Sequence, residues 1–268
     1  MDGQGHTIRP GTDPAEASRP PARERRLAWA GIILTSGLAW LYLLYLARGM
    51  DGGMAMEMGG MPMHHAWTWL DAWLMFLMWA VMMVAMMLPG ASPMILLYQR
   101  IAHQKMRQPR AAVALFASGY LLVWTAFSAI ATVAQWALRQ TGLVNDMMVS
   151  SSAALSATLL LAAGAYQLSP WKENCLLNCQ TPFAFVTQHW RSGPGGALVM
   201  GLHHGAYCLG CCWLMMALLF VGGVMNLLWI ALLALIVLVE KLLPGIRLAR
   251  GLGIVLLAAG IWVLLAPR

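Results

Sequence analysis

Residues 197–221 read Ala-Leu-Val-Met-Gly-Leu-His-His-Gly-Ala-Tyr-Cys-Leu-Gly-Cys-Cys-Trp-Leu-Met-Met-Ala-Leu-Leu-Phe-Val. This run is apolar, carries no charged side chain and is long enough to cross a bilayer as a helix. Its middle nevertheless holds a group of imidazole and sulfur side chains: His203, His204, Cys208, Cys211, Cys212, Met215 and Met216. Polar groups are costly in a spanning helix and usually serve a function there. The stretch therefore predicts a membrane helix that carries a site.

Helical spacing gathers several of these side chains on one face. At about 100° per residue, four of them share one stripe with Met200, and Trp213 lies opposite; the four are His204, Cys208, Cys211 and Met215. Thiolate, thioether and imidazole ligands together suit Cu(I) or another soft metal ion. The stripe, with His203 and Cys212 beside it, is a candidate copper site. The alternative is close packing, since Cys and Met fill apolar cores and Gly201 and Gly205 give a small-residue face.

The composition is that of a membrane protein. Of 268 residues, 60% are hydrophobic and only 10% are charged, which excludes an ordinary soluble domain. The net charge of +7 is spread through short loops, so we expect it to set membrane orientation rather than to bind nucleic acid. The five cysteines are an odd set and do not predict a disulfide framework. The 21 methionines are an excess that needs an explanation.

Apolar runs predict an all-α, polytopic membrane bundle of about seven transmembrane helices. The run from Leu27 to Ala47 is too long for a signal peptide and lacks a cleavage pattern, so we expect it to remain as the first span. The expected spans are 27–47, 69–89, 111–137, 151–168, 197–221, 224–240 and 250–266. Residues 1–26, rich in Pro, Gly and Arg, predict a disordered basic tail. Residues 27–268 then form one transmembrane domain.

Loop charges predict the orientation of this bundle. Seven spans place the basic residues on two sides: Arg9, Arg19, Arg23, Arg25, Arg26, Arg100, Lys105, Arg107, Arg110, Lys172, Arg191, Lys241, Arg247 and Arg250 on one, and Arg48, Arg139 and Arg268 on the other. The side with more Lys and Arg is normally cytoplasmic. We therefore expect a multi-pass protein of the bacterial inner membrane with its N-terminus in the cytoplasm and its C-terminus outside.

This topology places a methionine-rich loop, residues 50–65, on the outer side. The loop contains many thioethers and two imidazoles in a Gly-rich segment: Met50, Met54, Met56, Met58, Met61, Met63, His64 and His65. Methionine is normally a buried residue, so exposed methionines in such a segment suit the capture of a soft metal ion. The alternatives are a disordered linker or a surface contact.

The second expected span continues this chemistry into the bilayer. Met75, Met78, Met82 and Met86 share one face, with Asp71 at its outer end, whereas Met83 and Met87 lie to one side. Ordinary packing of methionine is the alternative. Pro89 is expected to end or kink this helix, and residues 94–102 to continue as a short helix.

Two further groups lie near the cytoplasmic ends of the spans. Cys175 and Cys179 share one face if their segment is helical, and reduced cytoplasmic thiols can bind metal; two ordinary small apolar cysteines are the alternative. Glu240 and Lys241 are most simply an interfacial ion pair. The alternative is that Glu240 orients His203 or His204 as ligands.

The chain resembles a known bacterial family in several short motifs. They are Ala85-Met-Met-Leu-Pro89, Gly164-Ala-Tyr-Gln-Leu168 with Lys172, Cys175-x-x-x-Cys179, Gly201-x-x-x-Gly205, Cys208-Leu-Gly-Cys-Cys-Trp213, Met215-Met216, Gly223-Val-Met-Asn226 and Glu240-Lys241. Over about residues 69–250 the chain is similar to predicted metal-binding integral membrane proteins. The resemblance implies an inner-membrane protein, with some relatives tied to copper supply for enzymes such as tyrosinase. It also implies the five cysteines as ligands, whereas the methionine-rich loop lies outside it.

These observations together predict a membrane protein that captures Cu(I) and transfers it across or along the membrane, supplying a periplasmic or membrane copper enzyme or a copper chaperone. A graded path from thioethers to thiolates favours inward transfer, and the reverse direction is the alternative. No phosphate-binding loop and no Ser–His–acid or paired-carboxylate site is present, so a transporter or metallochaperone is favoured over an enzyme. The alternative is a thiol–disulfide oxidoreductase that uses the cysteine pairs Cys208/Cys211 and Cys175/Cys179. Such an enzyme has no need of the methionine-rich loop or the His pair.

Overall fold

The computed structural model describes residues 22–49, 68–144, 150 and 152–266. Apart from an isolated bridge between Val144 and Ser150, the ordered elements in these ranges are helices. They are α2 (Ala22–Gly49), α4 (Trp69–Lys105), α5 (Pro109–Gln140), α6 (Ala153–Gln167), α7 (Pro170–Gln180), α8 (Pro182–His189), α9 (Gly193–Ala217), α10 (Leu219–Gly222), α11 (Leu227–Leu242) and α12 (Arg247–Leu265). The predicted all-α class is therefore confirmed for the described residues.

Five segments are long and apolar enough to cross a membrane. They are Ala22–Arg48, Trp69–Lys105, Pro109–Gln140, Gly193–Gly222 and Arg247–Leu265, and each overlaps a predicted span. The other two predicted spans are helical but shorter: α6 has 15 residues and α11 has 16. A membrane-spanning helix needs about 20 residues. The count of seven spans and the side on which each terminus lies therefore stay predictions.

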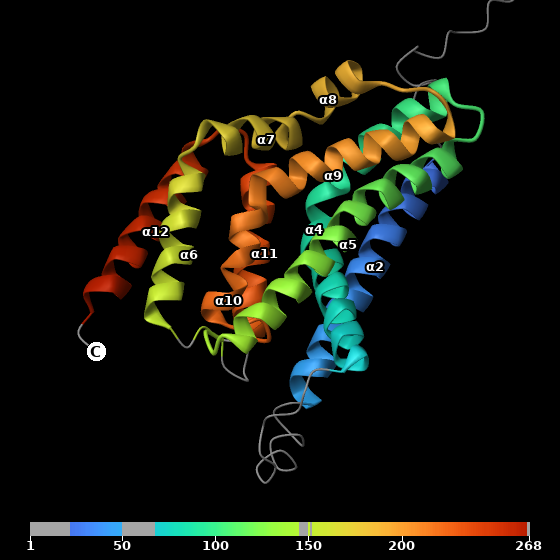
Figure 1. Cartoon of the computed structure of the whole chain (residues 1–268). Helices are drawn as coiled ribbons and strands as arrows, with labels where there is room; N and C mark the ends of the chain where they lie inside the picture. Colours follow the sequence, from blue (N-terminus) through green and yellow to red (C-terminus); the bar gives the residue numbers. More distant parts are fainter. Residues whose placement is uncertain (1–21, 50–67, 145–149, 151, 267–268) are drawn as a thin grey trace, which may run out of the picture.

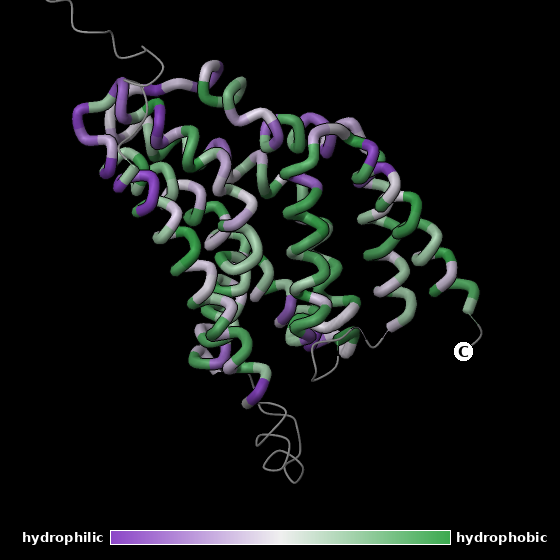
Figure 2. The backbone as a smooth tube through the Cα atoms, turned by 180° about the vertical axis from the view of Figure 1, so that it is seen from behind, coloured by the Kyte–Doolittle hydropathy of each residue, from purple (hydrophilic) through white to green (hydrophobic). Residues whose placement is uncertain are grey.

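The long helices stand side by side, and two short helices lie across one end of the bundle (Figure 1). These short helices are α7 and α8, and the connection from α4 to α5 lies at the same end. Hydrophobic residues dominate the middle of the bundle, whereas hydrophilic residues gather toward the end that carries α7 and α8 (Figure 2). Helix α9 packs on α5 and on α7, and α12 packs on α6. Helix α9 thus reaches from the bundle interior to the short helices.

Helix α4 passes through Pro89 and Pro93 without ending, so of the two predicted effects of Pro89 the end of the helix is wrong, and a kink stays a prediction. Proline lacks an N–H and leaves the carbonyl four residues earlier without its helical donor. Here other donors replace it: Trp40 Nε1 donates to the Ala85 carbonyl at 3.2 Å, and Ser92 Oγ donates to the Pro89 carbonyl at 2.7 Å. A spanning helix keeps such prolines only where its freed carbonyls are satisfied. The predicted helix over 94–102 is confirmed as part of α4.

Glycines allow α5 and α9 to approach backbone to backbone. A Cβ atom on Gly201 would overlap the Phe116 carbonyl, and one on Gly119 would overlap the Leu198 carbonyl. Small residues at such crossings are typical of membrane helix packing. This contact fixes the rotation of α9 and therefore the direction in which its cysteines point.

We expect Gly201→Ala to destabilise the protein by about 1–3 kcal/mol, because the added methyl group meets backbone atoms that cannot move aside. The measurement is thermal unfolding in detergent. Gly195→Ala is the matched control, since a Cβ there meets no atom within 4 Å. Equal unfolding temperatures for the two variants would contradict the close helix contact.

Candidate metal centre

The five cysteines come together from α7 and α9. Cys208, Cys211 and Cys212 are buried in α9, and all five thiols are free. The Cys179 thiol faces those of Cys208 and Cys211. The Cys175 sulfur lies over Gly210, where an added Cβ would be 2.8 Å from it. The structure thus brings the two predicted cysteine groups to one place.

The start of α7 and hydrogen bonds within α9 position the five thiols. Ser169 caps the start of α7 through its hydroxyl, which accepts from the Lys172 N–H at 3.2 Å, and Pro170 occupies the first helical position. The predicted helix through Cys175 and Cys179 is therefore formed. Within α9, the thiols of Cys211 and Cys212 donate to the Cys208 carbonyl at 3.1 and 3.0 Å. Both thiols are held beside Cys208 by their own helix.

Cys208 lies at the centre of contacts from three further helices. Lys241 Nζ, from α11, donates to the Cys208 sulfur at 3.0 Å and lies 3.6 Å from the Met87 sulfur of α4. The Tyr120 hydroxyl of α5 is 3.1 Å from the Cys208 sulfur and donates to the Met87 carbonyl at 3.0 Å. The Cys212 sulfur is 3.9 Å from that of Met87. Met87, Tyr120 and Lys241 are the residues that sequence reasoning missed.

No periodic signal distinguishes these three residues in the sequence. Met87 lies off the predicted methionine stripe, and Tyr120 belongs to an expected span, 111–137, that contains no Cys, His or Met. Lys241 follows Glu240, which suggests an ion pair between the two. The family resemblance covers Met87 and Lys241 within its motifs but gives no role to either. Only the packing of α4, α5 and α11 around α9 reveals them.

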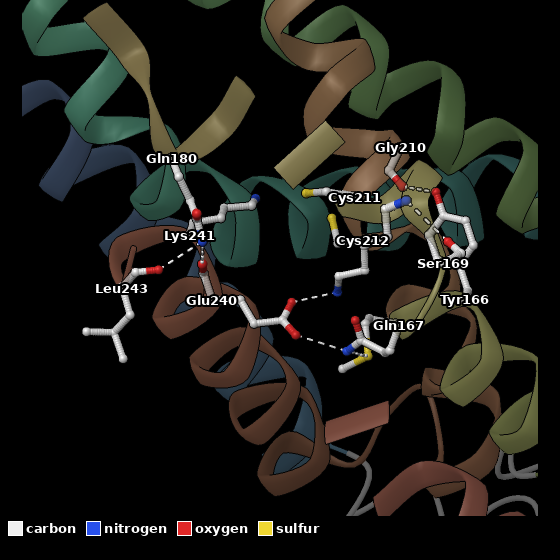
Figure 3. A network of polar contacts seen from close by, with 12 residues as sticks. Tyr166, Gln167, Ser169, Gln180, Gly210, Cys211, Cys212, Glu240, Lys241 and Leu243 are labelled. Atoms are coloured by element: carbon white, nitrogen blue, oxygen red, sulfur yellow. Dashed lines mark hydrogen bonds and ion pairs between the residues drawn. The ribbon is translucent and has the colours of Figure 1, made fainter. Parts of the chain in front are cut away.

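A buried ion pair lies next to the thiols (Figure 3). Lys172 Nζ of α7 is 2.7 Å from a Glu240 carboxylate oxygen, and both side chains are almost fully buried. The other Glu240 oxygen accepts from Gln167 Nε2 at 2.9 Å, and the same amide is 3.4 Å from the Met215 sulfur. Buried charges need such complete pairing. This network ties α7, which carries two of the thiols, to α6 and α11.

The predicted interfacial pair between Glu240 and Lys241 is therefore wrong. Adjacent residues on a helix point about 100° apart, and here Glu240 turns to Lys172 whereas Lys241 turns to Cys208. Both side chains are buried rather than interfacial. The alternative role of Glu240 toward the histidines is also not what the structure shows, because its carboxylate oxygens bind Lys172 and Gln167.

The two adjacent histidines point in different directions. His204 is buried among the rings of Phe116, Tyr120 and Phe185. His203 is exposed and faces His189, with 5.9 Å between ring centroids. Tyr120 stands between His204 and the thiols, since its ring stacks on His204 and its hydroxyl touches Cys208. The histidines thus border the thiol group rather than lie within it.

The predicted methionine stripe of α4 is inside the bundle. Met78, Met82 and Met86 are buried, and the Met75 sulfur accepts from Gln135 Nε2 at 3.2 Å. The predicted ligands of the outer loop, Met54, Met56, Met58, Met61, Met63, His64 and His65, lie outside the described residues, as does Met50. Met78, Met82 and Met86 are therefore buried in the same helix as Met87.

The donor set of this thiol site is soft. We use the name thiol site for the five cysteines together with Met87, Tyr120 and Lys241. Burial, aided by the neighbouring Cys211, raises the pKa of the Cys175 thiol, which lies outside the spanning segments, so metal binding there must release a proton. Within the described ranges, no three side chains of His, Cys, Asp or Glu form a ready-made metal site. Sulfur ligands of this kind suit Cu(I) once the thiols turn toward a common point.

Comparison with known proteins gives one finding. The model of a family described as PpoB2, copper chaperone, matches residues 76–263. This range contains all five cysteines, Met87, Tyr120 and Lys241, and it leaves out the methionine-rich loop. No curated protein and no solved structure matches the chain.

Proposed function

This chain belongs to the PpoB2 family of copper chaperones, and on that premise we propose that it is a membrane protein that binds Cu(I) at the thiol site and passes it on. The observation that carries the proposal is the meeting of thiols from α7 and α9 with the Met87 sulfur of α4 in a buried place. Thiolate and thioether ligands select Cu(I) by their softness. Because the sulfur ligands belong to three different helices, a small movement of one helix changes which of them bind the copper ion.

The route of the cargo follows the order of ligand strength. The outer loop, residues 50–65, captures the ion with exchangeable thioethers, and the partly buried Met75 and the buried Met78, Met82 and Met86 receive it. The thiol site then holds it more tightly through Cys208, Cys211, Cys212, Cys175 and Cys179, with His203, His204 and Met215 at its border. The buried positions of Met78, Met82 and Met86 and of the three cysteines of α9 support this route.

We also propose an orientation for the bundle, which the loop charges support. The end with α7 and α8 carries Lys105, Arg107, Arg110, Lys172 and Arg191, which the charge rule assigns to the cytoplasm. Copper then moves from the outer loop toward α7 on the inner side of the bacterial inner membrane. From there it reaches a copper enzyme or a soluble chaperone, so the protein acts as a metallochaperone or transporter rather than as a catalyst.

A pair of methionine variants tests this function. We expect reduced wild-type protein to bind one Cu(I) per chain, and Met87→Leu to weaken the affinity about tenfold because one of the sulfur donors is lost. Met83→Leu is the matched control, since Met83 is equally buried in the same helix and lies off the predicted stripe. The measurement is competition with a coloured Cu(I) chelator. Equal affinities for the two variants would contradict the placement of the site at Met87.

Thiol trapping separates this function from the oxidoreductase alternative. Mild oxidant followed by alkylation counts the thiols that pair reversibly. A copper chaperone is expected to protect its thiols from alkylation when Cu(I) is bound, whereas an oxidoreductase would pair them without any dependence on metal.

A further inference from the structure

A buried lysine lies where the sulfur atoms of the thiol site converge. Lys241 is 6% exposed, and its Nζ is 3.0 Å from the Cys208 sulfur and 3.6 Å from the Met87 sulfur. The Cys212 sulfur lies 3.9 Å from that of Met87. Gly90 leaves space for the lysine stem, because a Cβ there would come within 3.1 Å of the Lys241 Cδ. The ammonium group therefore contacts two soft donors, and a third lies beside one of them.

No carboxylate explains this position. Within the described residues, none of the ion pairs joins Lys241 to an acidic side chain. Glu240, its neighbour in sequence, is occupied by Lys172 and Gln167. A charged ammonium is normally excluded from an apolar interior unless a partner holds it. Here the partner is the sulfur of Cys208, with Met87 beside it.

We propose that Lys241 is the resident cation of the thiol site: its ammonium occupies the place of the cargo Cu(I), and copper binds by displacing it from Cys208. This inference rests on the proposed function, since it concerns the same site. In the step, Cys208 acts as the thiolate that the ammonium neutralises, so no proton leaves its sulfur. The Nζ–H to sulfur hydrogen bond breaks and a Cys208 sulfur–copper bond forms, while the ammonium keeps its charge and turns away on its flexible stem. When copper leaves, Lys241 returns to Cys208.

Two consequences follow from a tethered cation. Copper must compete with Lys241 for every binding event, so the affinity stays low enough for the ion to be handed on. The displaced ammonium also remains close to the bound ion, and its repulsion is twice as large for a divalent ion as for a monovalent one. Lys241 therefore favours Cu(I) over divalent ions that also bind thiolates, such as Cd²⁺ and Zn²⁺.

Removing the charge tests this role. Lys241→Leu and Lys241→Gln remove the ammonium without adding a sulfur donor, and Lys105→Leu is the matched control at an exposed position of α4. The measurements are Cu(I) affinity by chelator competition and Cd²⁺ binding by thiolate-to-metal absorption. We expect both Lys241 variants to bind Cu(I) at least tenfold more tightly than wild type and to gain Cd²⁺ absorption, whereas Lys105→Leu behaves as wild type.

The outcomes separate this inference from the proposed function. Wild-type protein that binds one Cu(I), together with Lys241 variants of unchanged or lower Cu(I) affinity, would overturn the role of Lys241 and leave the copper site standing. Wild-type protein that binds no copper would instead overturn the proposed function. Size-exclusion chromatography checks folding, and if Lys241→Leu aggregates, the polar Lys241→Gln variant decides the result.

Discussion

Replacing Cys208, Cys211 and Cys212 together with serine is expected to reduce bound copper from one Cu(I) per chain to none. The three thiols line the buried face of α9, and Cys208 is the one that touches groups from α5 and α11. Serine has nearly the same shape as cysteine but is a hard oxygen donor that Cu(I) does not prefer. Metal analysis after loading under reducing conditions and gel filtration gives the stoichiometry.

The control for this variant is Ala206→Ser, which adds a hydroxyl group to the exposed face of the same helix. It is expected to bind copper as wild type does. A folded triple-serine protein that still carries one Cu(I) per chain would move the copper site away from α9.

Replacing Lys172 with methionine is expected to lower the free energy of unfolding by about 3–5 kcal/mol, because it leaves the buried Glu240 carboxylate without its cation. Gln167 alone remains on that carboxylate through one hydrogen bond. The same change also frees α7, so we expect the α7 thiols to react faster with alkylating reagents. Thermal unfolding in detergent, together with the rate of alkylation, measures both effects.

Two further variants sharpen this prediction. Arg250→Met removes the pair between Arg250 and Glu173, in which both side chains are more than a third exposed, and exposed pairs contribute about 0–1 kcal/mol. The double change Lys172→Met with Glu240→Met removes both buried charges and is expected to recover most of the lost stability. A Lys172→Met protein as stable as Arg250→Met would contradict the buried network in Figure 3.

The stripe on α9 shows what helical periodicity can predict. Met200, His204, Cys208, Cys211 and Met215 were expected on one face with Trp213 opposite, and the structure buries all five and leaves Trp213 43% exposed. The rule succeeds because a long apolar segment has few other ways to satisfy its backbone in a membrane. It also placed Cys175 and Cys179 on one face of a helix, which α7 confirms.

Helical periodicity cannot predict contacts between helices that are distant in the sequence. Met87 meets the thiols because α4 packs on α5 and α11. Nothing in the sequence around Met87 distinguishes it from Met83, which lies one helical turn earlier. The Glu240–Lys241 pair failed for a related reason, since neighbouring charges on a helix find different partners when each faces another helix. Helix α4 passes Pro89 because Trp40, from a separate helix, supplies the missing donor.

The central claim is that sulfur atoms from α7, α9 and α4 hold the copper ion. X-ray absorption at the copper edge of the loaded, reduced wild-type protein tests it most directly, because it reports the element type and number of the nearest ligands. The account predicts a first shell of sulfur atoms alone, with one sulfur fewer in Met87→Leu. A first shell made only of nitrogen and oxygen atoms would contradict it.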